Sequence, residues 1–285
     1  MLSEQVNQRI ASFAQVLKQP LETLPKGELY AGVDLGTAYI VTAVVDSSGT
    51  PVAGAMTRSR ASVRDGLVLD YIGALSILRA QMQKLRNRGL KITHGAAAYP
   101  PGTSGRNAQA FGHVLESVEL EVAQLTDEPS AASKVLDISE GAVIDVGGGT
   151  TGISILKDGK VIYTADEATG GTHVDLVIAG HLGISVEKAE AMKCDPDKQR
   201  ELLPVVRPVF QKMATIVRNH LQGHGVENLY LVGGTSTFSG ITQVMADECE
   251  LPVLKPDMPL LVTPLGIALS CQQQMQGSSC LATAA

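Results

Sequence analysis

The stretch Val143-Ile-Asp-Val-Gly-Gly-Gly-Thr-Thr-Gly-Ile-Ser-Ile-Leu156 decides the fold of this chain. Apolar residues lead into Asp145, a run of glycines and threonines follows, and alternating apolar residues leave the turn, which is the pattern of strand, tight turn and strand. Glycines let the backbone adopt positive φ and let another group come close, and successive N–H groups in such a turn can bind an anion. An aspartate beside a phosphate needs a cation between them, and hydrated Mg²⁺ suits that position. The simpler interpretation of the glycines alone is a hairpin turn without a ligand.

A second copy of this pattern occurs about one domain's length earlier in the chain. Tyr30–Val41 again has an apolar lead, an aspartate (Asp34), a Gly-Thr turn and an alternating strand. Each copy continues into a hairpin, through residues 46–49 in the first and 157–160 in the second. Two related lobes, each with an Asp–Gly–Thr turn, could grip one phosphate chain from opposite sides.

The two turns resemble the two phosphate motifs of the actin-like ATPase superfamily, and they are most similar to its heat-shock chaperone branch. From Leu29 to Ser270 the chain also resembles the chaperone-like proteins of ethanolamine-utilisation operons. The segments that carry this resemblance follow one another along the chain at 32–37, 63–66, 99–103, 127–129 and 165–171. An ordered set of this kind is far more specific than one glycine-rich loop.

The resemblance implies an α/β, two-lobed actin-like fold, in which each lobe is a ribonuclease-H-like mixed sheet with flanking helices and nucleotide lies in the cleft between the lobes. Residues 1–26 are expected to form an N-terminal amphipathic helical arm. Lobe I, with the first phosphate motif, would comprise residues 27–138 and 264–285. Lobe II, with the second phosphate motif and the adenosine motif, would comprise residues 139–263.

The resemblance also implies ATP or ADP with Mg²⁺ as cofactors. The metal would be held, largely through water, by Asp34 and Asp145. The phosphates would be contacted by Gly36, Thr37 and Ala38 in lobe I and by Gly147, Gly148, Gly149, Thr150 and Thr151 in lobe II. A phosphate can also sit at the N-terminus of the helix that begins near Gly170.

Two carboxylates have implied catalytic roles, Asp145 at the metal and Glu128 as the residue that orients the attacking water. For Glu128 the alternative is a contribution to a helix cap, since an acidic residue is favourable in a first turn. The adenosine would be contacted by Glu190, Lys193, Gly233, Gly234 and Thr235. For Glu190 and Lys193 the alternative is an ordinary charge pair on an exposed helix.

Two departures from the chaperone ATPases point to slow hydrolysis or to binding without useful turnover. Those ATPases usually carry a carboxylate seven residues after the aspartate of the second motif, where this chain has Gly152. They also place a catalytic lysine soon after the first motif, and this chain has no lysine between Gly32 and Lys84. An arginine cannot act as the base in its place, although the basic residues available there are Arg58, Arg60 and Arg64.

Helical spacing predicts an amphipathic helix over 3–21, which either packs on its own domain or docks on a partner. The helix predicted over 202–222 belongs to the second lobe. Val262–Ser270 resembles the second connecting helix of the superfamily, and the tail beyond Cys271 is expected to be frayed.

The composition and the N-terminal sequence argue against several classes of protein. The 285 residues are 44% apolar and 18% charged, with a net charge of −6 and no tryptophan, which gives no support for nucleic-acid binding. The N-terminus lacks the features of a signal peptide, and no apolar run approaches the ~20 residues of a membrane span. The spacing of the four cysteines suggests no zinc site, so we expect reduced thiols in a cytoplasmic protein.

The resemblance to these proteins implies a chaperone-like nucleotide-binding protein and slow Mg²⁺-dependent ATPase. Its client would be an enzyme or shell protein of ethanolamine utilisation or of a related bacterial microcompartment, with no nucleic-acid or membrane partner. A non-hydrolysing assembly scaffold of the microcompartment is the main alternative. A cytoskeletal filament protein is a further alternative, although no polymer interface is identified in the sequence.

Overall fold

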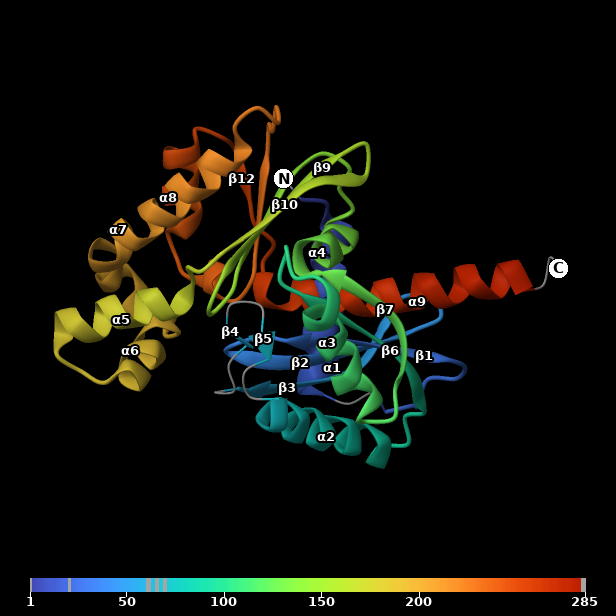
Figure 1. Ribbon diagram of the computed structural model, residues 1–285. Helices are drawn as coiled ribbons and strands as arrows, with labels where there is room; N and C mark the ends of the chain where they lie inside the picture. The colour runs from blue at the N-terminus through green and yellow to red at the C-terminus, as the bar shows by residue number, and fades with distance from the viewer. Residues whose placement is uncertain (1, 20–21, 60–62, 65–66, 69–70, 283–285) are drawn as a thin grey trace. The chain divides into compact units, whose positions relative to one another are not determined.

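The computed structural model describes residues 2–19, 22–59, 63–64, 67–68 and 71–282, and the chain divides into two compact units (Figure 1). Unit I comprises Ser3–Asp137 together with the segment from Leu261 onward. Unit II comprises Ile138–Leu260.

Unit I is built on a five-stranded sheet of order β3-β2-β1-β6-β7. The first three strands form an antiparallel meander and the last two are parallel to β1; they are β1 (Leu29–Leu35), β2 (Tyr39–Asp46), β3 (Pro51–Arg58), β6 (Ile92–Tyr99) and β7 (Glu121–Asp127). The helices that share a core with one face are α2 (Tyr71–Asn87) and α3 (Gly105–Glu116). The other face carries α1 (Glu4–Lys18), α4 (Glu128–Leu136) and α9 (Val262–Ala282). A separate two-residue pair is formed by β4 (Val63–Arg64) and β5 (Leu67–Val68).

Unit II repeats this arrangement with the order β10-β9-β8-β11-β12. The antiparallel meander is β8 (Gly141–Val146), β9 (Thr151–Lys157) and β10 (Lys160–Glu167), and the parallel additions are β11 (Leu229–Val232) and β12 (Val253–Leu254). One face shares its core with α5 (Gly171–Leu182), α6 (Val186–Lys193), α7 (Pro196–Leu221) and α8 (Ile241–Cys249). Short 3₁₀ turns follow at η1 (Thr235–Thr237) and η2 (Pro259–Leu261). Because β8 occupies the position of β1, the two Asp–Gly–Thr turns follow equivalent strands, and the expectation of a duplicated actin-like α/β fold is confirmed.

Close packing of α9 in unit I depends on two glycines. A Cβ atom at Gly32 of β1 would lie 2.1 Å from the backbone nitrogen of Ala268. A Cβ atom at Gly266 of α9 would lie 2.0 Å from the carbonyl oxygen of Ala131 in α4. The missing side chains therefore let α9 touch β1 and α4 backbone to backbone.

The N-terminal helix α1 packs on unit I. The side chain of Ser3 caps it by accepting from the N–H of Val6, and its apolar stripe, including Ile10 and Phe13, is buried. Phe13 and Leu17 lie against Gly54 of β3, where a Cβ atom would come within 2.8 Å of both side chains. The stripe is thus covered within the unit, which is the first of the two alternatives for this segment.

The expected start of the long helix of unit II was wrong. Helix α7 begins at Pro196 instead of residue 202, because the Asp195 side chain accepts from the N–H of Asp197 and Pro196 takes the first turn. Two further prolines, Pro204 and Pro208, lie inside the helix. Both lie within the predicted range 202–222, so only the capped start of the helix at Pro196 was missed.

The expectation of a frayed tail beyond Cys271 was also wrong. Helix α9 continues to Ala282, and glutamine side chains tie it to unit I. The amides of Gln272 and Gln276 donate to the Ser47 carbonyl at 3.1 and 2.6 Å, and Gln273 accepts from Lys134 at 2.9 Å. Among the described residues no helix is long and apolar enough to cross a membrane.

The thiols of the described chain should differ strongly in reactivity. Burial raises the pKa of Cys271 to about 12 and that of Cys249 to about 11, whereas Cys194 is exposed. Because the thiolate is the nucleophile, iodoacetamide at pH 8 should modify Cys194 first and the two buried thiols only after unfolding. Peptide mass spectrometry with and without urea checks this order, and early modification of Cys271 would contradict the packing of α9.

Candidate functional site

The second Asp–Gly–Thr turn of the chain lies in unit II and is a tight loop between β8 and β9. The N–H of Gly147 closes it by donating to the Thr150 carbonyl at 2.9 Å. Residues 147–150 are half-buried. The next N–H groups, those of Gly148, Gly149 and Thr150, have no acceptor within the part of the chain that the structure describes. Adjacent unsatisfied N–H groups in a turn form an anion-binding concavity.

The carbonyl groups of this turn are held by the protein. Gly147 accepts from the N–H of Gly171 at 3.0 Å and from the Thr235 hydroxyl at 2.7 Å. Gly148 accepts from both the N–H and the hydroxyl of Thr172, at 2.8 and 2.9 Å. The first N–H groups of α5 thus donate to the turn and are not open to a phosphate in this structure.

The third glycine motif lies directly beside Asp145. A Cβ atom at Gly233 would lie 2.3 Å from Oδ1 of Asp145 and 2.5 Å from the Val146 carbonyl oxygen, and Gly233 has a φ of +89°. Asp145 itself is 7% exposed. Unit II therefore brings together the sequence-predicted residues Asp145, 147–150 and 233–235.

The donor set fits hydrated Mg²⁺ better than a protein-caged metal. The described residues contain no group of three or more His, Cys, Asp or Glu side chains that could hold a metal ion. Mg²⁺ is usually bound through one or two carboxylates with several waters and substrate phosphates. The Asp145 carboxylate beside a phosphate-type turn matches that pattern.

The other predicted residues of unit II have different surroundings. Thr151 is 0% exposed and its hydroxyl donates to the Thr169 carbonyl at 2.7 Å, so this hydroxyl is not part of the cradle. Lys193 forms an ion pair of 2.8 Å with Asp175 and donates to the Gly171 carbonyl at 3.2 Å. Glu190 lies one turn earlier on α6 and is half-buried. Asp175 and Thr172 were missed by sequence reasoning, and their only signal is their place just after the Gly-Gly pair.

The first Asp–Gly–Thr turn of the chain lies in unit I and joins β1 to β2. A Cβ atom at Gly36 would lie 2.8 Å from the Tyr39 carbonyl oxygen and 3.6 Å from Oδ1 of Asp34, so the turn needs glycine and the carboxylate lies beside it. The Ala38 carbonyl accepts from the N–H of Ser59 at 2.8 Å. Gly36, Thr37 and Ala38 are half-buried, as residues 147–150 are, and Asp34 is half-buried whereas Asp145 is buried.

Glu128 is the first residue of α4 and is half-buried. The cap of this helix is Asp127, whose side chain accepts from the N–H of Ser130 at 2.9 Å. Asp127 is thus the side-chain cap, and Glu128 is the acidic residue of the first turn, where its charge is favourable, as its alternative role requires. Of the arginines that follow the first motif, Arg58 is exposed at the end of β3, Arg60 lies outside the described residues, and only the backbone of Arg64 is described.

Gly152 of β9 contributes no side chain to the face of the sheet that carries Asp145. It pairs with Asp145 on one side and with Asp166 of β10 on the other. Directly paired residues on neighbouring strands lie on the same face. The position beside Asp145 thus carries no side chain, and the next carboxylate among these paired residues is two strands away.

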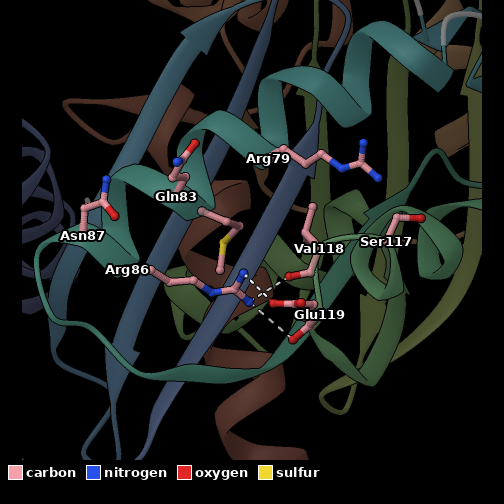
Figure 2. Close-up of a pocket in the computed structure, with 8 residues that line it drawn as sticks. Arg79, Gln83, Arg86, Asn87, Ser117, Val118 and Glu119 are labelled. Atoms are coloured by element: carbon pink, nitrogen blue, oxygen red, sulfur yellow. Dashed lines mark hydrogen bonds and ion pairs between the residues drawn. The ribbon is translucent and has the colours of Figure 1, made fainter.

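A separate hollow lies in unit I between the C-terminal half of α2 and the turn after α3 (Figure 2). The Arg86 guanidinium crosses it to pair with the Glu119 carboxylate at 3.2 Å and to donate to the Val118 carbonyl at 2.8 Å. None of the predicted site residues lines this hollow. The Arg86 side chain therefore joins α2 to the turn that precedes β7.

The repeated sheets and the glycine turns after equivalent strands define the actin-like ATPase fold. Among solved structures, MreB5 of Spiroplasma citri bound to AMPPNP shares this fold with a TM-score of 0.72 at 17% identity, covering 90% of this chain and 99% of that one.

Within that class the chain belongs to the family of the ethanolamine utilization protein EutJ. The Escherichia coli K12 EutJ is 43% identical over 251 residues, covering 87% of this chain and 88% of the relative. The crystal structure of EutJ from Carboxydothermus hydrogenoformans superposes with a TM-score of 0.86 at 44% identity, covering 93% of this chain and 97% of that one. Residues 115–259 also match the model of the family described as type IV pilus assembly protein PilM.

Proposed function

We propose that the chain is a chaperone-like ATP- and ADP-binding protein that hydrolyses ATP slowly and assists a protein of ethanolamine utilisation. The observation that carries this proposal is the turn 147–150 with its open N–H groups. The turn directly follows strand β8, which carries the buried carboxylate of Asp145. Phosphoryl transfer depends mainly on positioning and charge stabilisation, and this turn supplies fixed donors for a phosphate. MreB5, which shares the fold, binds AMPPNP.

In this proposal the residues of each unit have separate roles. In unit II the N–H groups of 148–150 bind phosphate oxygens, Asp145 orients the waters of Mg²⁺, and the glycines 233–234 admit the adenosine. In unit I Asp34 and the turn 36–38 form the equivalent phosphate-type turn, and Glu128 is the carboxylate that orients the attacking water. Mg²⁺, when bound, supplies charge neutralisation.

The expected rate of hydrolysis is low because position 152 has no side chain beside Asp145. We extend the proposal to a client in the enzyme or shell of an ethanolamine-utilising microcompartment, in the cytoplasm, following the pathway for which the EutJ relatives are named. The same Gly152 favours the second candidate, an assembly scaffold that binds nucleotide without hydrolysing it. A phosphate-release assay separates the two, because the scaffold gives no release above the rate without protein.

Calorimetric titration of ATP and ADP, with and without Mg²⁺, tests the proposal. We expect Mg²⁺-dependent binding by the native chain and its loss in Asp145→Ala, because the hydrated metal would then lack its carboxylate. Asp247→Ala is the matched control, since Asp247 is an exposed residue of α8 in the same unit, and it should bind as the native chain does. Absence of ATP and ADP binding by the native chain would overturn the proposal.

A further inference from the structure

The geometry points to Thr235 as a positioning residue that aims the phosphate-binding N–H groups, in place of the adenosine contact expected for it. This inference rests on the proposed nucleotide binding and adds how the cradle is held in shape. Its partner in this role is Thr172, and the two threonines act through the carbonyl groups of the turn.

The planarity of the peptide group relates the carbonyls of this turn to its N–H groups. In a trans peptide unit the C=O of one residue and the N–H of the next lie in one plane and point in opposite directions. The Gly147 carbonyl is held by Thr235 and Gly171, so the N–H of Gly148 must point to the opposite side. The Gly148 carbonyl is held twice by Thr172, which directs the N–H of Gly149 in the same manner.

The Thr235 hydroxyl can donate only one hydrogen bond. A threonine hydroxyl has one proton to donate, and Thr235 donates it to the Gly147 carbonyl at 2.7 Å. With a residue exposure of 6%, the side chain is enclosed among its neighbours. It therefore has no donor left for a ribose or a base.

The space around the Thr235 hydroxyl is crowded. A Cβ atom at Gly171 would lie 2.5 Å from Oγ1 of Thr235 and 2.9 Å from Nζ of Lys193. Glycine at 171 thus lets the hydroxyl, the ammonium group and the start of α5 meet at the turn. Glycine peptides are otherwise free to rotate, and the carbonyl clamps remove that freedom before a ligand arrives.

The two roles for Thr235, positioning the turn or contacting adenosine, predict different effects on ligand affinity. Loss of the Thr235 clamp should weaken every ligand that uses the N–H groups of Gly148 and Gly149, whether or not it carries adenosine. An adenosine contact would instead be lost only for ligands that contain adenosine.

The test compares ADP with tripolyphosphate, both with Mg²⁺, on the full chain. Thr235→Val keeps the shape and removes the hydroxyl, and it should weaken both ligands about tenfold, the value of one well-placed hydrogen bond. Thr235→Ser restores the hydroxyl and should recover both affinities. Thr215→Val is the matched control, because its hydroxyl also donates to a backbone carbonyl, that of Gln211 at 2.9 Å, within α7.

The outcomes separate this inference from the proposed function. Equal weakening of both ligands with rescue by serine supports the positioning role. Weakening of ADP alone would assign Thr235 to the adenosine and overturn the inference, while the nucleotide function would stand. Unchanged binding of both ligands by Thr235→Val would likewise overturn it. A native chain that binds neither ligand overturns the proposed function itself.

A spectroscopic readout distinguishes positioning from general destabilisation. Tripolyphosphate should shift the amide proton resonances of Gly148 and Gly149 downfield in the native chain, because both groups donate to it. In Thr235→Val the shift at Gly148 should shrink more than that at Gly149, whose clamp is Thr172. Loss of the Gly148 shift with an unchanged fold, monitored by circular dichroism, supports the clamp.

Discussion

Replacing Gly266 by alanine should destabilise unit I by about 3 kcal/mol, at the upper end of the usual cost of overpacking. The added Cβ atom would lie 2.0 Å from the Ala131 carbonyl oxygen and 2.5 Å from its carbonyl carbon. Both contacts are with backbone, so no flexible side chain can move aside. Helices α9 and α4 would have to separate, and α9 would then lose part of its contact with β1. Urea unfolding followed by circular dichroism should show a clear drop in the midpoint.

The same helix offers a matched control. Gly277 is exposed on α9, and a Cβ atom there would meet nothing within 4 Å. Gly277→Ala should leave stability unchanged or raise it by up to about 1 kcal/mol, since alanine has the higher helix propensity. A Gly266→Ala chain as stable as Gly277→Ala would show that α9 does not pack on α4 as described.

Replacing Lys193 by methionine should destabilise unit II by about 3 kcal/mol at neutral pH, because removing one partner of a buried pair leaves the other charge uncompensated. The side chains of Lys193 and Asp175 are only 13% and 8% exposed and lie 2.8 Å apart. The ammonium also donates to the Gly171 carbonyl. Its loss should therefore loosen the start of α5 as well, which hydrogen exchange of the α5 amides can detect.

Lys188→Met is the control for this substitution, since Lys188 is exposed on the same helix, and it should change stability by no more than about 0.5 kcal/mol. The double variant Lys193→Met with Asp175→Leu should recover much of the loss, because an apolar pair can replace a buried ion pair. Equal effects of Lys193→Met and Lys188→Met in urea unfolding would mean that the pair adds nothing to unit II.

Local patterns in the sequence were sufficient for much of the fold. The hairpins β2–β3 and β9–β10 turn at residues 46–49 and 157–160, as the sequence predicted. The two Asp–Gly–Thr turns follow equivalent strands, as their repetition predicted. The start of α7 and the glutamine-rich end of α9 are exceptions, because a cap decides the first and tertiary contacts decide the second.

The residue types of the unit II site could also be predicted from sequence. Glycine is needed where the backbone closely approaches a carboxylate, as between Gly233 and Asp145. Such a requirement can be predicted from the sequence because only glycine lacks a Cβ atom. The roles of Thr151, Thr235 and Lys193 could not be predicted in this way. Each carries a polar group whose partner is chosen by the fold.

The sequence by itself determined that this protein has two copies of one phosphate-type turn, each at the end of a strand, and that glycine fills the positions of closest approach. Only the tertiary structure decided which polar groups shape the turn and which stay open. Thr235 and Gly147 are 88 positions apart in the chain, and nothing in either local pattern relates them. Hydrogen bonds are short and directional, so the assignment of donors to acceptors depends on where the folded backbone brings each group.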